Sequence, residues 1–247
     1  MTVLLDTSME SGPMVPPSGP SNAMIMLVGE APGEHEVAKM QPFVGRAGWE
    51  LNKQLEEAGI ARSMCFITNV ARRRPPGDKI KAFFANKTQA KKLGIPELAG
   101  RYPTAEVIEG MSLLRREIEL VQPNIIVSLG DIALWAITGD SGIDKWRGSQ
   151  LMLDWAPIKV IPTYHPAGVL RRYSWHHIAV KDFIKVARES LTREYVKPET
   201  HVVVRPSFEE VSDTIGDYWG ALQQGPFPLA QDIETFFGQI ACIAFSK

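Results

Sequence analysis

Three polar side chains that could bind a small ligand stand at, or directly after, the ends of apolar runs. They are Glu30, in the turn Gly29-Glu30-Ala31-Pro32-Gly33, together with Asn69 and His165. The runs that lead into them are MIMLVG (24–29), CFITNV (65–70) and IKVIPTYHP (158–166). A carboxylate accepts hydrogen bonds, an amide accepts and donates, and an imidazole can do either. Brought together, these groups could read the polar edge of a ligand and hold a water molecule.

Such side chains converge only if the chain segments that carry them are neighbours. The three runs and a fourth, IIVSLG (125–130), are short and continuously apolar, which is typical of buried strands. Helices are predicted at 47–58, 105–121, 131–138 and about 176–195. This alternation favours a three-layer αβα fold around a central parallel sheet of about four strands. Ligands of such sheets bind at the carboxyl ends of the strands, where the three polar side chains are expected.

The composition is that of a globular protein, with 247 residues, 45% of them hydrophobic and 22% charged. No apolar run reaches the roughly 18 residues of a membrane helix, and no secretion signal is recognisable, so we expect a cytoplasmic protein without a membrane partner. Residues 1–23 are rich in Ser, Pro, Gly and Met, and we predict either a disordered leader or a remnant of recombinant expression. Cys65 and Cys242 are the two cysteines, too few for a four-cysteine metal site.

The net charge of −1 conceals an uneven distribution. The residues up to Pro198 contain 25 basic and 21 acidic side chains, whereas those after it contain 2 and 7. Much of the basic excess lies in one stretch, opposed only by Asp78: Arg72, Arg73, Arg74, Lys79, Lys81, Lys87, Lys91 and Lys92. This asymmetry indicates an anionic partner for the first part of the chain.

Five segments, taken together, resemble the uracil-DNA glycosylase superfamily in their order and spacing, most closely its family 4. They are GEAPGEHE (29–36), QPFVGRAG (41–48), FITNVARRRPPGD (66–78), WRG (146–148) and PTYHPAGVLRR (162–172). The resemblance covers about residues 24–193 and is specific only in combination, because each segment alone is common. It implies hydrolysis of the bond between uracil and deoxyribose, on a base flipped out of the DNA helix.

The resemblance assigns three residues to the uracil ring. Phe43 is implied as the stacking wall, and His165 as a donor to uracil O2, where negative charge develops as the base leaves. The Asn69 amide offers a donor and an acceptor that match uracil O4 and N3–H, a pairing that disfavours cytosine. Read without the family, Phe43 could be a core aromatic, Asn69 a turn cap and His165 a structural histidine.

Water activation is implied for Glu30, with support from Glu36. Other branches of the superfamily carry an aspartate at the position of Ala31, so the water-orienting carboxylate stands one residue away in this chain. The backbone N–H of Ala31 is expected to line the uracil pocket, and Glu36 is expected among the uracil-binding residues as well.

A second implied group contacts DNA. Leu170 resembles the wedge that holds the flipped base from the minor groove, and Arg171 and Arg172 follow it as phosphate ligands. Arg73 and Arg74 in the RRRPP loop are further expected phosphate ligands. The alternative for both segments is a solvated basic turn.

This sequence departs from family 4 in two respects, which limit how far the roles known in that family can be assigned to its residues. Members of that family usually hold a [4Fe-4S] cluster on four cysteines, but here the first pair has no counterpart and the later positions are Arg73 and about Gly110. The cluster is therefore predicted to be absent, with no cofactor for the glycosylase-like part, and packing of the 79–104 insertion is expected to replace its stabilising role. The asparagine after the RPP loop is replaced by Asp78, which adds a negative charge near the expected phosphate path.

The end of the chain carries a separate resemblance. After a linker at 197–200, a strand-like HVVV, a helix-like segment and the run Asp232-Ile233-Glu234-Thr235 resemble the start of a DnaQ-like 3'-5' exonuclease domain of a DNA polymerase. There the Asp and Glu would bind divalent metal such as Mg²⁺, in a complete domain only. We therefore expect a leader at 1–23, a glycosylase-like domain at 24–196, and a linker with an incomplete α/β exonuclease fragment at 197–247.

The favoured function is a uracil-DNA glycosylase fused to a replication polymerase segment of viral kind, acting in the cytoplasm of a bacterium or of an infected host. Uracil-containing DNA is the expected partner, with other replication proteins possible. The alternative is a non-catalytic module of the same fold that binds DNA or a replication partner. A nucleotide-binding protein is disfavoured, because the first turn contains neither GxGxxG nor a P-loop.

Overall fold

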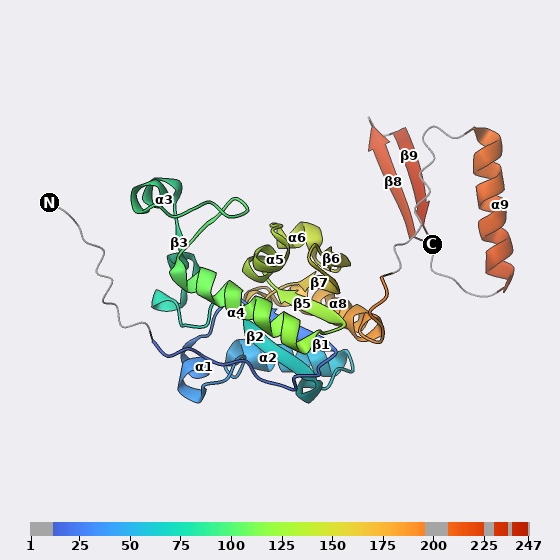
Figure 1. The fold of residues 1–247 in the computed structure, drawn as a ribbon. Coiled ribbons are helices and arrows are strands. Elements are labelled where there is room, and N and C mark those ends of the chain that lie inside the picture. The colour runs from blue at the N-terminus through green and yellow to red at the C-terminus, as the bar shows by residue number, and fades with distance from the viewer. Residues whose placement is uncertain (1–11, 196–206, 225–229, 237–238, 247) are drawn as a thin grey trace. The chain divides into compact units, whose positions relative to one another are not determined.

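The computed structural model describes residues 12–195, 207–224, 230–236 and 239–246. The chain divides into two compact units, Met1–Tyr195 and Val196–Lys247 (Figure 1). Each is described by itself below. The expected domain limits at 196 and 197 fall next to this division.

The first unit is built on a five-stranded sheet with the order β2-β1-β5-β7-β6. Its strands are β1 (Ile25–Gly29), β2 (Cys65–Asn69), β5 (Ile125–Leu129), β6 (Leu151–Leu153) and β7 (Ala156–Thr163). β2, β1, β5 and β7 pair in parallel, which confirms the predicted α/β class and its parallel sheet of about four strands. The short β6 was not predicted and pairs antiparallel with β7 at the edge.

Helices cover both faces of the sheet, because strand side chains point alternately to opposite sides (Figure 1). Met26 and Val28 of β1 belong to one buried cluster with α4 and α5, whereas Leu27 belongs to another with α2 and α8. The helices are α1 (Glu34–Lys39), α2 (Arg46–Glu57), α4 (Ala105–Val121), α5 (Asp131–Thr138), α6 (Ile143–Trp146), α7 (Pro166–Arg171) and α8 (His176–Glu189). α8 ends at Glu189, earlier than predicted, and the next residues form turns.

The basic insertion at 79–104 folds into short elements, two of them strands. They are η3 (Ile80–Phe83), β3 (Phe84–Ala85), α3 (Lys87–Leu93) and β4 (Tyr102–Pro103); η1 (Arg62–Met64), η2 (Pro76–Asp78) and η4 (Tyr173–Trp175) lie elsewhere. The insertion packs on α5 through an edge-on contact of the Phe84 and Trp135 rings, whose centroids are 5.4 Å apart. The Trp135 indole N–H also donates to the Leu98 and Ala99 carbonyls.

The expectation of disorder before residue 24 is wrong for residues 12–23. Val15 is buried, and its N–H donates to the Arg72 carbonyl at 2.9 Å. Ser18 forms an antiparallel bridge with Ile67 of β2. This order comes from pairing with the exposed edge of β2, which a Ser- and Pro-rich composition does not reveal. Residues 1–11 lie outside the described residues.

The second unit consists of α9 (Phe208–Gln224) and an antiparallel hairpin of β8 (Ala230–Phe236) and β9 (Gln239–Ser246). The helix and the two strands agree with the α/β pattern expected of this segment, whereas the strand-like HVVV (201–204) lies outside the described residues. None of the helices that the structure describes is long and apolar enough to cross a bilayer.

Candidate active site

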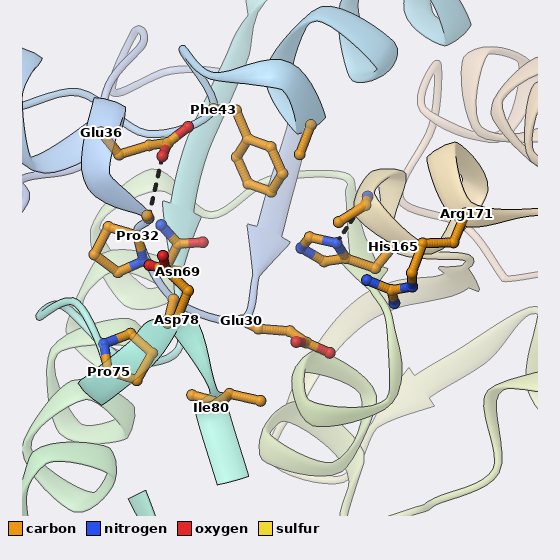
Figure 2. Close-up of a pocket in the computed structure, with 14 residues that line it drawn as sticks. Glu30, Pro32, Glu36, Phe43, Asn69, Pro75, Asp78, Ile80, His165 and Arg171 are labelled. Carbon is orange, nitrogen blue, oxygen red and sulfur yellow. Dashed lines mark hydrogen bonds between the residues drawn. The ribbon is translucent and has the colours of Figure 1, made fainter. Parts of the chain in front are cut away.

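A pocket of about 270 Å³ opens at the carboxyl ends of β1, β2 and β7 (Figure 2). It is lined by Glu30, Ala31, Pro32, Gly33, Glu36, Phe43, Ala47, Asn69, Pro75, Asp78, Ile80, His165, Ala167 and Arg171. All six residues that sequence reasoning assigned to catalysis and uracil therefore line one pocket. Of the residues assigned to DNA, Arg171 lines it as well.

Asn69 and Phe43 meet at the last residue of β1. Gly29 pairs with Asn69 in the parallel register of β1 and β2. A side chain at Gly29 would collide with the Asn69 carboxamide oxygen and the Phe43 ring, so both groups pack directly on the Gly29 backbone. The Asn69 amide makes no hydrogen bond to another described residue, and its donor and acceptor remain available to a ligand.

The Phe43 loop is held by Glu36 of α1. One Glu36 carboxylate oxygen accepts the N–H groups of Val44 and Gly45, at 3.1 and 2.8 Å, and the other accepts that of Gly33 at 3.1 Å. Phe43 adopts a φ of 53°, a left-handed conformation that costs about 1–3 kcal/mol for a bulky residue. Glu36 thus ties the first turn to a strained loop, and three of its acceptor positions are occupied by backbone.

His165 faces Phe43, with ring centroids 5.8 Å apart and the planes tilted by 37°. It is the N-cap of α7, and its Nδ1 accepts the N–H of Ala167 at 3.1 Å. A backbone N–H can donate only to an unprotonated nitrogen, so the neutral ring carries its proton on Nε2. Burial lowers the pKa of His165, although the nearby Glu30 carboxylate opposes the shift. The result is a neutral imidazole with an Nε2–H donor in the pocket (Figure 2).

Glu30 begins the turn after β1 and lies beside His165. Both residues lie close to Gly130, which directly follows β5. A side chain at Gly130 would come within 3.0 Å of both the Glu30 carboxylate and the His165 Cβ. The Glu30 carboxylate accepts no hydrogen bond from another described residue, unlike that of Glu36. Glu30 is therefore the better placed of the two to hold a water molecule.

The predicted wedge lies directly after His165. Leu170 is 39% exposed near the end of α7, and Arg171 reaches the pocket. The Arg172 guanidinium lies over the Trp175 ring, 5.0 Å from its centroid. An exposed apolar side chain is thus followed in the sequence by two cations, the first of which lines the pocket.

The basic loop differs from the wedge, because its charges face other protein groups. Arg72 is buried and forms a 2.6 Å ion pair with Glu117 of α4. Arg73 donates to the Gly12 carbonyl at 2.6 Å. Arg74 forms a bidentate pair with Asp78, at 2.7 and 2.8 Å, and also contacts Glu34.

The exonuclease-like acidic residues, Asp232 and Glu234, lie within β8 of the second unit. Their side chains are outside the described residues, so the expected metal ligands remain a prediction.

The geometry agrees with comparisons to known proteins. A sequence model of the Uracil DNA glycosylase superfamily matches residues 16–191. The chain belongs to this superfamily. It is 34% identical over 187 residues to the type-4 uracil-DNA glycosylase of Sulfurisphaera tokodaii, covering 72% of this chain and 75% of the relative. The type-4 enzyme of Thermotoga maritima is 38% identical over 159 residues, covering 63% and 71%. A DNA polymerase of Bacillus phage SP01 is 29% identical over 180 residues, which cover 72% of this chain but 17% of the polymerase.

This superfamily member does not offer the ligands of an iron-sulfur cluster at the expected positions. Gly110 packs α4 so closely on the chain after β2 that any side chain there would collide with the Val70 carbonyl oxygen. Cys65 is buried at the start of β2, and burial raises the pKa of its thiol to about 12, which disfavours the thiolate that binds metal. No group of three or more His, Cys, Asp or Glu in the described part of the chain could hold a metal ion. The residues present do not fit the cluster.

Sequence reasoning missed part of the glycosylase pocket wall. Pro75, Asp78 and Ile80 line the pocket from the loop after β2 and the insertion. No periodicity marks such residues, because irregular segments reach the pocket only through tertiary packing. Asp78 was singled out for its charge, and the structure places it in the pocket wall rather than only beside a phosphate path.

Proposed function

We propose that the first unit is a uracil-DNA glycosylase that hydrolyses the N-glycosidic bond of uracil flipped out of DNA. The observation that carries this proposal is the convergence in one pocket of an aromatic wall, a histidine donor, and an amide and a carboxylate whose side chains make no hydrogen bond within the described part of the chain. Family membership and the type-4 relatives support it, since those relatives are named for this activity. A degenerate binding module would have no need of all four groups.

In this proposal the uracil ring stacks on Phe43, and the Asn69 amide pairs with its O4 and N3–H. The His165 Nε2–H donates to O2, where negative charge accumulates as the bond between N1 and C1′ breaks. Glu30 orients a water molecule and takes its proton as the water oxygen bonds to C1′, leaving an abasic sugar and the uracil anion, which takes up a proton from solvent on release. Preorganised donors of the His165 kind lower the barrier by about 3 kcal/mol. No step needs a metal or a cofactor.

The test uses uracil-containing single- and double-stranded oligonucleotides, with alkali-labile abasic sites as the readout. The wild-type chain is expected to release uracil, also in the presence of EDTA, whereas His165→Ala and Asn69→Ala are expected to lose about 10²–10³ in kcat. Glu56→Gln, exposed on α2, is the control and should retain activity. Binding of DNA without any release of uracil would instead support the non-catalytic module.

We further infer that the second unit is the opening segment of a polymerase-associated 3'-5' exonuclease domain. The Asp232/Glu234 spacing within β8 supports it. A phage DNA polymerase that matches 180 residues of this chain is consistent with a polymerase context. Asp232 and Glu234 are expected to bind metal only in a complete domain, so the test uses a chimera in which residues 197–247 replace the opening segment of a complete polymerase exonuclease domain. Mn²⁺ binding, followed by electron paramagnetic resonance, is expected in the chimera and should disappear in Asp232→Ala/Glu234→Ala, and binding that is the same in both proteins would contradict the inference.

A further inference from the structure

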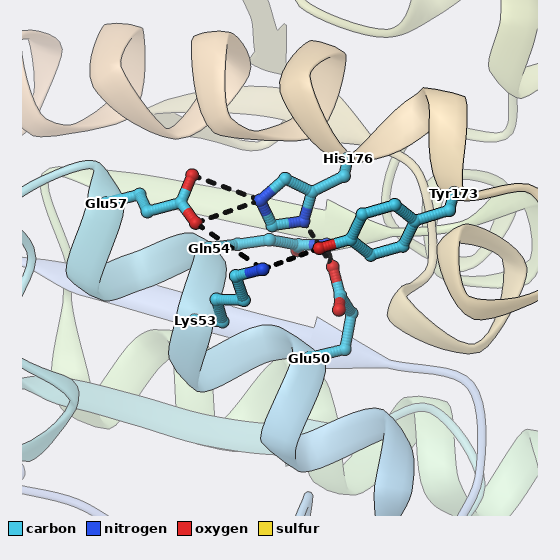
Figure 3. A network of polar contacts seen from close by, with 6 residues as sticks. All are labelled: Glu50, Lys53, Gln54, Glu57, Tyr173 and His176. Atoms are coloured by element: carbon cyan, nitrogen blue, oxygen red, sulfur yellow. Dashed lines mark hydrogen bonds and ion pairs between the residues drawn. The ribbon is translucent and has the colours of Figure 1, made fainter.

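A polar network outside the pocket joins helix α2 to the start of helix α8 (Figure 3). His176 is 1% exposed, and its Nδ1 lies 2.6 Å from a carboxylate oxygen of Glu50, which is also buried. Its Nε2 lies 3.0 and 3.1 Å from the two carboxylate oxygens of Glu57. Gln54 donates to Glu50 at 2.8 Å, which completes the inner part of the network.

The network has an outer layer at the surface. The Tyr173 ring stacks on the His176 ring, with centroids 5.1 Å apart and planes 16° from parallel. The Lys53 ammonium of α2 donates to the Tyr173 hydroxyl at 2.6 Å. Both layers therefore connect α2 with the segment that runs from η4 into α8.

The hydrogen-bond geometry of the His176 ring restricts how α2 and α8 can be oriented relative to each other. The two nitrogens of the His176 ring point in different directions, and each lies within hydrogen-bond distance of a different carboxyl group of α2. A buried His between two carboxylates on one helix therefore fixes both the distance and the angle between α2 and α8.

Both partners of this connection lead to the proposed active site. α2 begins directly after the Phe43 loop, while His176 follows the segment that starts at His165 and contains the wedge. That segment is closed at its base by stacking of Tyr164 on Trp175, with centroids 4.1 Å apart and planes 8° from parallel. α7 packs directly on α2, and Lys53 reaches Tyr173, while His176 adds side-chain hydrogen bonds to α2 where the segment ends.

We propose that His176 is a positioning residue that fixes the wedge segment, 166–175, relative to the Phe43 loop through Glu50 and Glu57. The proposal rests on the proposed glycosylase function for its consequence, since a correctly placed wedge matters for flipping a base from a duplex. A single-stranded substrate has no opposing strand to be separated, so its cleavage depends less on the wedge.

The experiment compares His176→Gln with wild type on uracil in double- and single-stranded DNA. A glutamine cannot donate to two carboxylates on opposite sides, so kcat/KM on duplex is expected to fall by about ten- to hundredfold, and on single strands by several-fold less. Glu57→Gln, at a half-exposed position, changes the same contact with less risk to folding and should lower the duplex-to-single-strand ratio in the same direction. Glu56→Gln is the matched control on the same helix and should leave the ratio unchanged.

Hydrogen exchange of the free proteins gives a second readout that needs no activity. Amides of 166–175 are expected to exchange faster in both variants than in wild type, while those of β1 and β5 keep their rates. Unchanged exchange in 166–175 would overturn the proposal, as would an unchanged ratio in an active enzyme. If wild type cleaves neither substrate, the glycosylase function fails, and the exchange rates alone decide whether His176 holds the segment.

Discussion

Two arginine-bearing segments border the pocket, and they use their charges in opposite ways. In the basic loop, Arg72 and Arg74 pair with Glu117 and with Asp78. In the wedge segment, Arg171 and Arg172 form no ion pair with another described residue, and they directly follow the exposed Leu170. Counting basic residues in the sequence favours the loop as the DNA contact, whereas the geometry favours the wedge. An arginine can bind a phosphate only if its guanidinium is not already paired with a carboxylate of the folded protein.

Among the substitutions that test this difference, the largest expected effect is on the free energy of unfolding. Arg72→Ala leaves the Glu117 carboxylate without its partner in a largely buried position, so the free energy of unfolding should fall by about 3–5 kcal/mol. Urea unfolding followed by circular dichroism measures it. Glu119→Ala, which removes an exposed ion pair with Arg115, should change it by less than about 0.5 kcal/mol. Equal losses in the two variants would mean that Arg72 is not a structural cation.

The next effect concerns DNA binding. Arg171→Ala should weaken DNA binding and lower the salt dependence of the association constant by about one unit of slope, because one phosphate contact is lost. Arg172→Ala should act alike. Arg74→Ala should change the slope little, since its guanidinium is occupied by Asp78 and Glu34. Fluorescence anisotropy over a series of salt concentrations is the measurement, and a larger change for Arg74 than for Arg171 would reverse the comparison.

A smaller effect is expected from removing the carboxylate that pairs with Arg74. The hydrogen bonds from Arg74 lower the pKa of Asp78, so the pair is intact at neutral pH. Asp78→Asn removes the negative charge and frees Arg74, and DNA affinity should rise by several-fold, with a slope increased by up to about one unit. Asp154→Asn, an exposed aspartate after β6, serves as the control. If Asp78→Asn binds DNA no better than this control, the ion pair with Asp78 is not what keeps Arg74 from binding DNA.

The same contrast explains which features the sequence could predict. β1, β2 and β5 and the pocket residues at their ends follow from short apolar runs and from a parallel sheet, whose ligand site has a fixed edge. The ordered residues 12–23 depend on pairing with the distant strand β2, and β6 is only three residues long, so neither has a pattern that the sequence reveals. Glu36 was expected near uracil, yet its bonds to three backbone N–H groups are visible only once two turns are folded together. Glu50 and His176 are polar, so the sequence gives no sign that both are buried.

The wedge side has a further property that the arginine loop lacks, a histidine whose pKa is lowered by folding. Burial lowers the pKa of His165 in the folded state, so the unfolded chain binds the proton more tightly. Stability from this group is complete above the unfolded value of about 6.5 and is lost as the pH falls from there toward the lower folded value. Protonation also removes the Nδ1 acceptor of the Ala167 N–H. Wild type should therefore lose more unfolding free energy than His165→Gln between neutral and mildly acidic pH, whereas Arg74→Ala should follow wild type, because an arginine stays charged throughout. Parallel curves for wild type and His165→Gln would show that the histidine is not held neutral by the fold, and the tautomer assigned to its Nε2–H donor would lose its basis.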